Sequence, residues 1–316
     1  MKKKDAELLQ KLCSIHAPSG SESAVKNFLL EYIQKEQENW KVTPQIIYGE
    51  NFQDCIILIF GNPKTAIFAH MDSVGYSVGY NNELLKIGGP KAEEGTPLIG
   101  EDSNGHIVGK LHYKIEEEED EKKIIKMVLT TDRIIDRGTT LTYQPNFIET
   151  KDYIQNCYLD DRMGVLNALK VAETLEDGAI AFSTWEEVGG GSIGFLAKYL
   201  FETHQVRQAL ISDITWITEG VKHGDGVAIS IRDSGIPRRS YIDKIISLAK
   251  DSLIDFQLEV ESAGGSDGNA LQKSPYPFDW CFIGAPEENV HMPNEKVHQH
   301  DFESMHLLYS YLMKNL

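Results

Sequence analysis

A change of pattern in the middle of the chain constrains its fold more than any other feature of the sequence. In the second half, short apolar runs typical of buried strands alternate with apolar residues at helical spacing, as in the run 179–185 and the stripe 193–200. Between about Tyr76 and Ile154 the helical spacing disappears, and short segments of alternating polar and apolar residues replace it. The chain therefore combines an α/β part with an inserted β part.

We expect one α/β domain that is split by the insertion. Alternating strands and helices favour a three-layer α/β/α sandwich with a mixed sheet, formed by residues 1–75 and 155–316. Residues 76–154 are expected to form a small β-barrel-like domain, in which the acidic run 116–121 is interpreted as a solvated hairpin tip rather than a recruitment surface. The expected helices carry apolar stripes at 8–15, 25–33, 165–175, 193–200, 242–253 and 302–312, and the expected strands of the α/β domain are 55–60, 66–70, 179–185, 209–214, 256–261 and 280–283.

Composition excludes several classes of protein. The 316 residues include 48 acidic and 31 basic side chains, and the net charge of −17 argues against a nucleic-acid-binding surface. There is no run of 18 apolar residues, which argues against a membrane span. The basic start of the chain is followed by Asp5-Ala6-Glu7 rather than by an apolar segment, so we expect no signal peptide. The four cysteines are scattered and form no CxxC pair, which is typical of thiols in a reducing compartment and predicts a cytoplasmic protein.

Side chains suited to metal binding or proton transfer follow three of the predicted strands. His70 and Asp72 end one strand, Glu186 and Glu187 follow a second, and Asp213 follows a third. Open α/β sheets bind their ligands beyond the carboxyl ends of the strands, so these side chains are expected at one edge of the sheet. Adjacent residues at a strand end point to different sides, so one of the two glutamates can bind a metal while the other faces the substrate.

Asp160 and His291 extend this group of residues. Asp160-Asp161 precedes a predicted helix, where helix capping is the alternative interpretation. His291 lies in a predicted loop, where an ordinary surface residue is the alternative, and His298 and His300 are its nearest competitors. Together with the strand-end residues they form a histidine and carboxylate set without thiolate, which suits zinc, cobalt or manganese. A carboxylate has two oxygens and can bridge two ions.

Six short strings of the sequence resemble the motifs of one enzyme family, in that family's order. They are His70-Met71-Asp72, Leu159-Asp160-Asp161-Arg162-Met163-Gly164, Glu186-Glu187-Val188-Gly189, Ser212-Asp213-Ile214, Gly265-Ser266-Asp267 and His291-Met292-Pro293-Asn294-Glu295. Each string alone is weak evidence. Together they resemble metallopeptidase family 42, which comprises the glutamyl, deblocking and tetrahedral (TET) aminopeptidases.

The resemblance implies a site for two divalent ions per chain, with zinc as the first choice and cobalt or manganese as alternatives. His70 and Asp213 would hold one ion, Glu187 and His291 would hold the other, and Asp160 would bridge the two. These roles are carried over from the family motifs onto the matching positions of this sequence.

The resemblance also implies an activity and an assembly. Glu186 would be the general base for hydrolysis of the first peptide bond of a peptide with a free N-terminus, and Asp72 would fix the ring of His70. The peptide between Asp160 and Asp161 would be cis. The inserted domain would correspond to the family's apical domain, so we expect a homo-oligomer between a dimer and a tetrahedral dodecamer.

Three other readings remain open at this point. A related amidohydrolase, either a deacylase or a carboxypeptidase, could use the same metal centre, and Arg232, Arg238 or Arg239 could then bind a terminal carboxylate. A glycosidase of the endoglucanase type needs two carboxylates and gives the histidines no role. A metal-binding scaffold without catalysis gives Glu186 no role.

Overall fold

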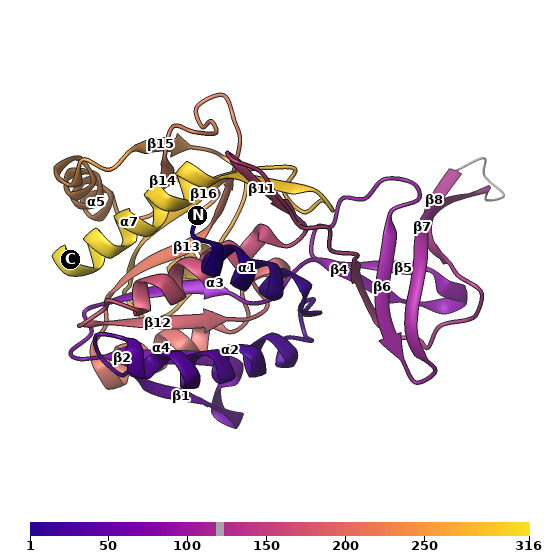
Figure 1. The fold of residues 1–316 in the computed structure, drawn as a ribbon, viewed down its shortest axis with the longest axis horizontal. Helices are drawn as coiled ribbons and strands as arrows, with labels where there is room; N and C mark the ends of the chain where they lie inside the picture. The colour runs from indigo at the N-terminus through magenta and orange to yellow at the C-terminus, as the bar shows by residue number, and fades with distance from the viewer. Residues whose placement is uncertain (118–122) are drawn as a thin grey trace.

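A large mixed sheet runs through the main body of the protein. The computed structural model describes residues 1–117 and 123–316, and eleven of its strands form this sheet, with the central order β1-β2-β12-β3-β13-β16-β17-β11-β10 and with β14 and β15 at the side of β16 (Figure 1). The four central strands β12, β3, β13 and β16 are parallel to one another, and the strands outside them (β1, β2, β17, β11 and β10) pair antiparallel. The strands are β1 (Gln45–Gly49), β2 (Gln53–Phe60), β3 (Thr65–His70), β10 (Ile148–Glu149), β11 (Tyr153–Asn156), β12 (Gly178–Ser183), β13 (Gln208–Trp216), β14 (Val227–Arg232), β15 (Phe256–Val260), β16 (Asp279–Glu288) and β17 (Glu295–His298).

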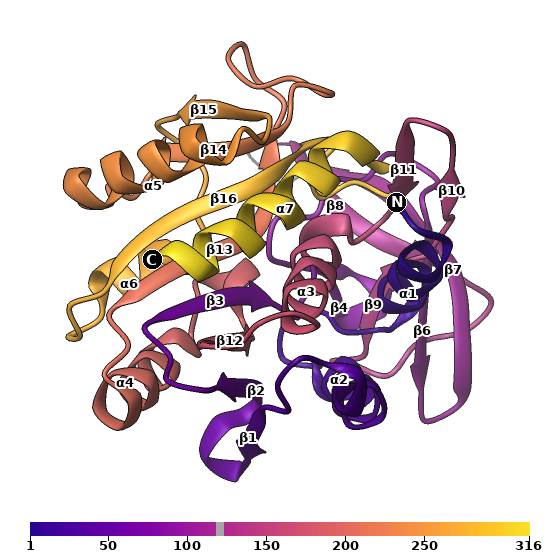
Figure 2. The same cartoon turned by 60° about the vertical axis from the view of Figure 1, so that its left-hand side comes forward.

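Helices cover both faces of the sheet and produce three layers. Successive residues of β2 enter opposite cores, because side chains alternate between the faces of a strand: Ile56 packs in one core and Ile57 in the other. The first core includes residues of α1, α2, α3, α5 and α7, and the second includes residues of α4 and α6. Figure 2 shows α3 and α7 next to each other on one face of the sheet. The helices are α1 (Lys3–Ser14), α2 (Ser23–Glu36), α3 (Leu159–Ala172), α4 (Ile193–His204), α5 (Arg239–Ser252), α6 (Asp267–Lys273) and α7 (Gln299–Asn315).

A second, smaller sheet projects from the main body (Figure 1). Its six strands have the order β5-β4-β9-β6-β7-β8 and enclose a core of their own. A bridge between Glu83 and Val128 brings the two edges of this sheet together, so the sheet is nearly closed as a barrel. The strands are β4 (Gly75–Val78), β5 (Leu84–Ile87), β6 (Pro97–Asp102), β7 (Gly105–Glu117), β8 (Lys123–Thr130) and β9 (Thr140–Tyr143).

The fold class predicted from the sequence is confirmed, and so is each predicted element of the α/β part, with small changes at the ends. The strand predicted at 280–283 is longer, since β16 runs from Asp279 to Glu288, and β13 continues beyond Asp213. β7 and β8 form an antiparallel hairpin, but residues 118–121 of the predicted acidic tip lie outside the described residues. The division into domains at 76 and 154 stays a prediction, and strand β10 within that range pairs into the large sheet.

Two further observations on the described residues concern membrane spans and cysteines. No helix in the described part of the chain is long and apolar enough to cross a membrane. The four cysteines are buried and unpaired.

Candidate metal centre and active site

Parallel strands bring the predicted strand-end residues together. His70 is the last residue of β3, Asp213 lies in β13 beside it, and Glu186 and Glu187 form a short 3-10 turn (Glu186–Val188) just after β12. His70 and Asp213 are buried. The carboxyl ends of β3, β12 and β13 thus lie at one edge of the sheet, as the sequence predicted.

The ligand atoms of the expected metal-binding residues form two adjoining groups. In one group, atoms of His70, Asp161 and Asp213 all lie within 4.8 Å of one another, and in the other the same holds for Asp160, Glu187 and His291. The structure therefore brings all five predicted ligands into these two groups. Asp161 is the additional member.

Asp160 joins the two groups. Its Oδ1 lies 3.1 Å from Nε2 of His70, and its Oδ2 lies 3.3 Å from Nε2 of His291. His291 Nε2 also lies 3.2 Å from Oε2 of Glu187, and His70 Nε2 lies 3.8 Å from Oδ1 of Asp213. One carboxylate thus faces both histidines, with one oxygen toward each.

Both histidines are oriented by their second ring nitrogen. Nδ1 of His70 lies 3.2 Å from the carbonyl oxygen of Asp72, and Nδ1 of His291 lies 3.2 Å from the carbonyl oxygen of Gly89. A carbonyl only accepts, so Nδ1 of each ring donates a hydrogen bond, and Nε2 is the ring nitrogen that faces the carboxylates and is available to a metal ion. A Cβ at Gly89 would lie 3.1 Å from Nδ1 of His291, so a larger residue there would press on this ring.

The residues fit a pair of divalent cations. Glu187 has a side chain that is 3% exposed, and its Oε1 has no hydrogen-bond partner among the described residues. Burial raises the pKa of Asp213 well above its usual value, and repulsion from Asp160 adds to this shift. Burial lowers the pKa of His291, but hydrogen bonds with Asp160 and Glu187 outweigh it and raise this pKa to about 11. Imidazole nitrogens and carboxylate oxygens in this number match zinc, cobalt or manganese, and a cation would relieve the repulsion between the carboxylates.

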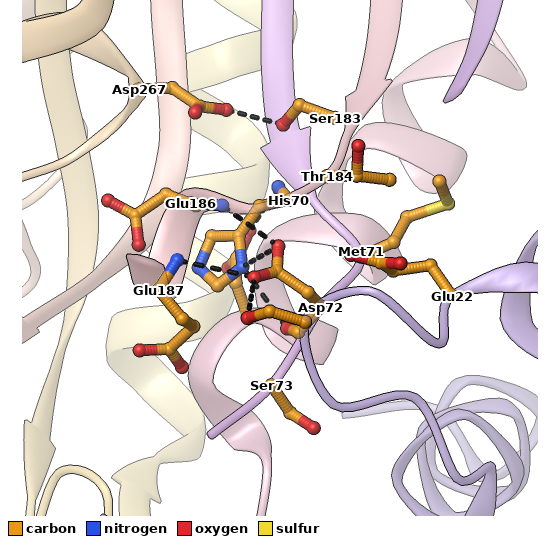
Figure 3. Close-up of polar contacts among 12 residues, drawn as sticks. Glu22, His70, Met71, Asp72, Ser73, Ser183, Thr184, Glu186, Glu187 and Asp267 are labelled. Atoms are coloured by element: carbon orange, nitrogen blue, oxygen red, sulfur yellow. Dashed lines mark hydrogen bonds and ion pairs between the residues drawn. The ribbon is translucent and has the colours of Figure 1, made fainter. Parts of the chain in front are cut away.

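Asp72 connects the His70 ring to the glutamate turn. Its Oδ1 lies 3.4 Å from Nδ1 of His70 and accepts a hydrogen bond from the backbone N–H of Glu186, while its Oδ2 accepts from the N–H of Glu187 and from the hydroxyl of Ser19 (Figure 3). Burial raises the pKa of Asp72, but the bonds from His70 and these donors outweigh burial and hold it below its usual value. Asp72 is thus a buried anion that fixes both the ring and the backbone of the turn.

The two glutamates of the turn differ in their surroundings. Figure 3 shows their carboxylates pointing in different directions. Glu187 belongs to a ligand group, whereas Glu186 belongs to neither of the groups found among the described residues. Burial raises the pKa of Glu186 well above its usual value; His70 opposes this shift, and Asp213 and Glu187 add to it. Both glutamates line a cavity of about 270 Å³.

Two carboxylates support the centre in ways that the sequence analysis did not foresee. Asp161 accepts hydrogen bonds from the N–H groups of His70 and Gly164. Glu295 is 1% exposed, and its Oε2 accepts from the N–H groups of Leu159 and Asp160 while its Oε1 accepts from the N–H of His291. Glu295 is the last residue of the motif that begins at His291. Its place in that motif, four residues after His291, was the only local sign in the sequence of a role at the site.

The backbone around the centre is unusual. The Asp160–Asp161 peptide is cis, as the family resemblance implied, and neither residue has helical backbone angles, so Asp160-Asp161 is not a simple helix start. Positive φ angles occur at Tyr158 (66°), Trp185 (62°) and His291 (67°). His291 is itself a candidate functional residue, and the other two lie within two residues of one. Such conformations cluster at functional sites in proteins.

The competing residues lie elsewhere. His300 contacts Asp255, and His298 caps α7, so neither belongs to the two ligand groups. Arg238 and Arg239 form exposed ion pairs with acidic partners. The cavity lining contains no arginine or lysine among the described residues, so nothing in it would bind the terminal carboxylate of a carboxypeptidase substrate.

Comparison with known proteins identifies the family. A sequence model of the M42 glutamyl aminopeptidases matches residues 104–308. A protein from Acetivibrio thermocellus, provisionally named an aminopeptidase, is 25% identical and aligns with 94% of this chain and 95% of its own length.

Solved structures share the fold. A TET aminopeptidase from a marine sediment archaeon of the Thaumarchaeota has a TM-score of 0.84 at 20% identity, covering 99% of this chain and 98% of that one. The TET1 peptidase of Pyrococcus horikoshii has a TM-score of 0.78 at 22% identity, covering 98% of each chain. That peptidase is described as assembling into a tetrahedron or a large octahedral shell.

The protein is a hydrolase of peptide bonds. The chain belongs to the M42 glutamyl aminopeptidase family, since the family model matches well over half of its residues. The resemblance noted in the sequence is thereby confirmed.

Proposed function

We propose that this aminopeptidase depends on two divalent ions, with zinc as the first choice and cobalt or manganese as alternatives. The observation that supports this most directly is the position of Asp160, with one oxygen toward each histidine. His70 and Asp213 would hold one ion, Glu187 and His291 the other, and Asp160 would bridge them. The bound ions would supply Lewis-acid activation of a water molecule and of the scissile carbonyl.

The protein's own residues perform the proton transfer in this proposal. Glu186 accepts a proton from the attacking water and delivers it to the leaving amine. Its position supports this role, because it lines the cavity beside the ligand groups without belonging to either. Burial, with repulsion from Asp213 and Glu187 in addition, raises the pKa of Glu186 and favours its proton uptake. Asp72 acts as a positioning residue through the His70 ring and the backbone of the turn.

A substrate panel tests the proposed function. We expect aminoacyl p-nitroanilides to be hydrolysed in the presence of zinc or cobalt, and the matched N-acetyl-aminoacyl p-nitroanilides to be left intact. N-acetylated amino acids and carboxymethylcellulose serve as substrates for the deacylase and glycosidase alternatives. Hydrolysis of either of these, without release of p-nitroaniline from the unblocked compounds, would contradict the proposal.

We further propose that residues 76–154 form a separate domain through which the chain forms a homo-oligomer. The small sheet projects from the body with its own core and leaves Val108, Ile115 and Ile125 exposed. The assembly of the Pyrococcus horikoshii relative supports the proposal. We also propose a cytoplasmic location, supported by the four unpaired cysteines.

Light scattering tests the assembly. We expect the full chain to form a homo-oligomer, and a variant with a short Gly/Ser linker in place of the small sheet to be folded and smaller. Circular dichroism of the linker variant checks that the body remains folded. A monomeric mass for the full chain would contradict the proposal.

A further inference from the structure

The cavity that holds the candidate catalytic residues extends to a second wall. This wall is formed by the end of β14, by β15 and by the loop that follows, and it carries Asp233, Glu259 and Glu261. β14 and β15 pair in parallel, which places the ends of both strands on the same side. The cavity is continuous with the candidate metal centre, because its lining includes Glu187, whose buried Oε1 has no hydrogen-bond partner among the described residues.

The acidic wall is distinct from the metal-binding groups. The two divalent ions would be held by the carboxylates of Asp160, Glu187 and Asp213, none of which belongs to the wall. The hydrogen bonds to the wall carboxylates come from neutral groups. The hydroxyl of Thr215 donates to Glu259, and the N–H of Gly235 donates to Asp233.

The nearby Arg232 forms no side-chain ion pair with this wall among the described residues, although its charge opposes the rise that burial causes in the pKa of Asp233. Nε of Arg232 donates to the carbonyl oxygens of Asp233 and Glu261, and Arg232 does not belong to the cavity lining. Asp233 is 7% exposed and Glu259 is 4% exposed. Burial raises the pKa of both carboxyls, and a cation placed between them would offset that penalty.

The rest of the cavity suits an extended aliphatic chain. Ile214, Trp216 and Phe282 contribute apolar surface to the lining of the same cavity. A cavity that combines apolar surface with carboxylates matches side chains with an aliphatic stem and a charged end.

We propose that this aminopeptidase prefers peptides with an N-terminal lysine or arginine, whose cationic end is bound by Asp233, Glu259 and Glu261. The inference rests on the proposed function and adds the substrate class. The stem of the side chain packs against the apolar residues, while the scissile bond lies beside Glu186.

The test compares substrates that differ in the cationic end alone. We expect kcat/KM of the metal-loaded enzyme for lysyl p-nitroanilide to exceed that for the norleucyl compound by about 10- to 100-fold, since hydrogen bonds to charged groups have this magnitude. The arginyl compound should be preferred similarly, and the glutamyl compound should be the poorest substrate because the wall repels it.

Variants of the wall identify the residues responsible. We expect Glu259→Gln and Glu261→Gln each to lower the ratio of lysyl to norleucyl kcat/KM by about tenfold. Glu261 is partly exposed, so its variant folds even if the buried Glu259 variant does not. Glu219→Gln is the matched control, because it removes the same charge from an exposed loop outside the cavity and should leave the ratio unchanged.

The outcomes separate the two proposals. A norleucyl substrate hydrolysed as fast as the lysyl one would overturn the basic preference and leave the aminopeptidase mechanism intact. An equal loss for all substrates in the wall variants would assign the wall to the α-amine, and would also overturn the preference. Failure of the metal-loaded enzyme to hydrolyse any unblocked substrate would overturn both.

Discussion

Replacing Glu186 with glutamine should lower kcat by about 10²- to 10⁴-fold, the usual contribution of a general acid–base residue. Metal content should stay the same, because Glu186 belongs to neither ligand group of the described residues. The exchange keeps the size of the side chain and removes only its ability to take up a proton. Steady-state kinetics together with metal analysis by mass spectrometry measure both effects.

The neighbouring substitution Glu187→Gln is the matched control. It makes the same chemical change one residue away, but there it replaces an anionic ligand 3.2 Å from His291 with a neutral amide. We expect one ion to be lost or bound much more weakly, because a cation then lacks one of its compensating charges. If Glu186→Gln loses metal and Glu187→Gln keeps it, the two roles are exchanged. If both variants keep metal and activity, the glutamates only stabilise the turn, at about 1 kcal/mol each.

Removal of the metal ions should abolish hydrolysis, and readdition of zinc or cobalt should restore it with about two ions per chain. Removal of the ions should also lower the stability of the folded protein. Burial and repulsion from Asp160 raise the pKa of Glu187 and Asp213, so the metal-free centre holds carboxylates that repel one another. A ligand present at 1,000 times its Kd stabilises a protein by about 4 kcal/mol, so readdition should raise Tm.

An Asp160→Asn variant is the control for this experiment. Zinc added to the variant should restore neither activity nor Tm to the level of the unaltered protein, because Asp160 is the residue whose carboxylate faces both histidines. Activity that survives exhaustive chelation, with no metal detected by mass spectrometry, would reject the whole assignment of the site.

Regular patterns explain why the fold could be predicted from the sequence. The strands β2 and β3 are buried on both faces, so they are visible as continuous apolar runs, and helices such as α1 and α5 have one apolar stripe each. Helix α6 was missed because seven residues are too few to show a stripe. Its start depends on a capping box in which Ser266 and Asn269 bind each other's backbone N–H groups.

The site could be predicted only in part, for a related reason. His70 and Glu187 follow strands, and strand ends are recognisable in the sequence. The support from Glu295 depends on N–H groups of Leu159 and Asp160, which lie 136 and 135 residues away along the chain. No spacing rule connects such partners, because they come together only when the large sheet has formed and β11 pairs with β17.

The single carboxylate of Glu295 has a consequence for the local motions of the protein. It binds the amides of Leu159, Asp160 and His291, which come from the start of α3 and from the loop after β16. None of these amides can exchange its hydrogen with solvent until its bond to Glu295 opens, and rupture at this one carboxylate frees all three. Two distant segments of chain, each carrying a candidate metal ligand, therefore form one cooperative unit in hydrogen exchange.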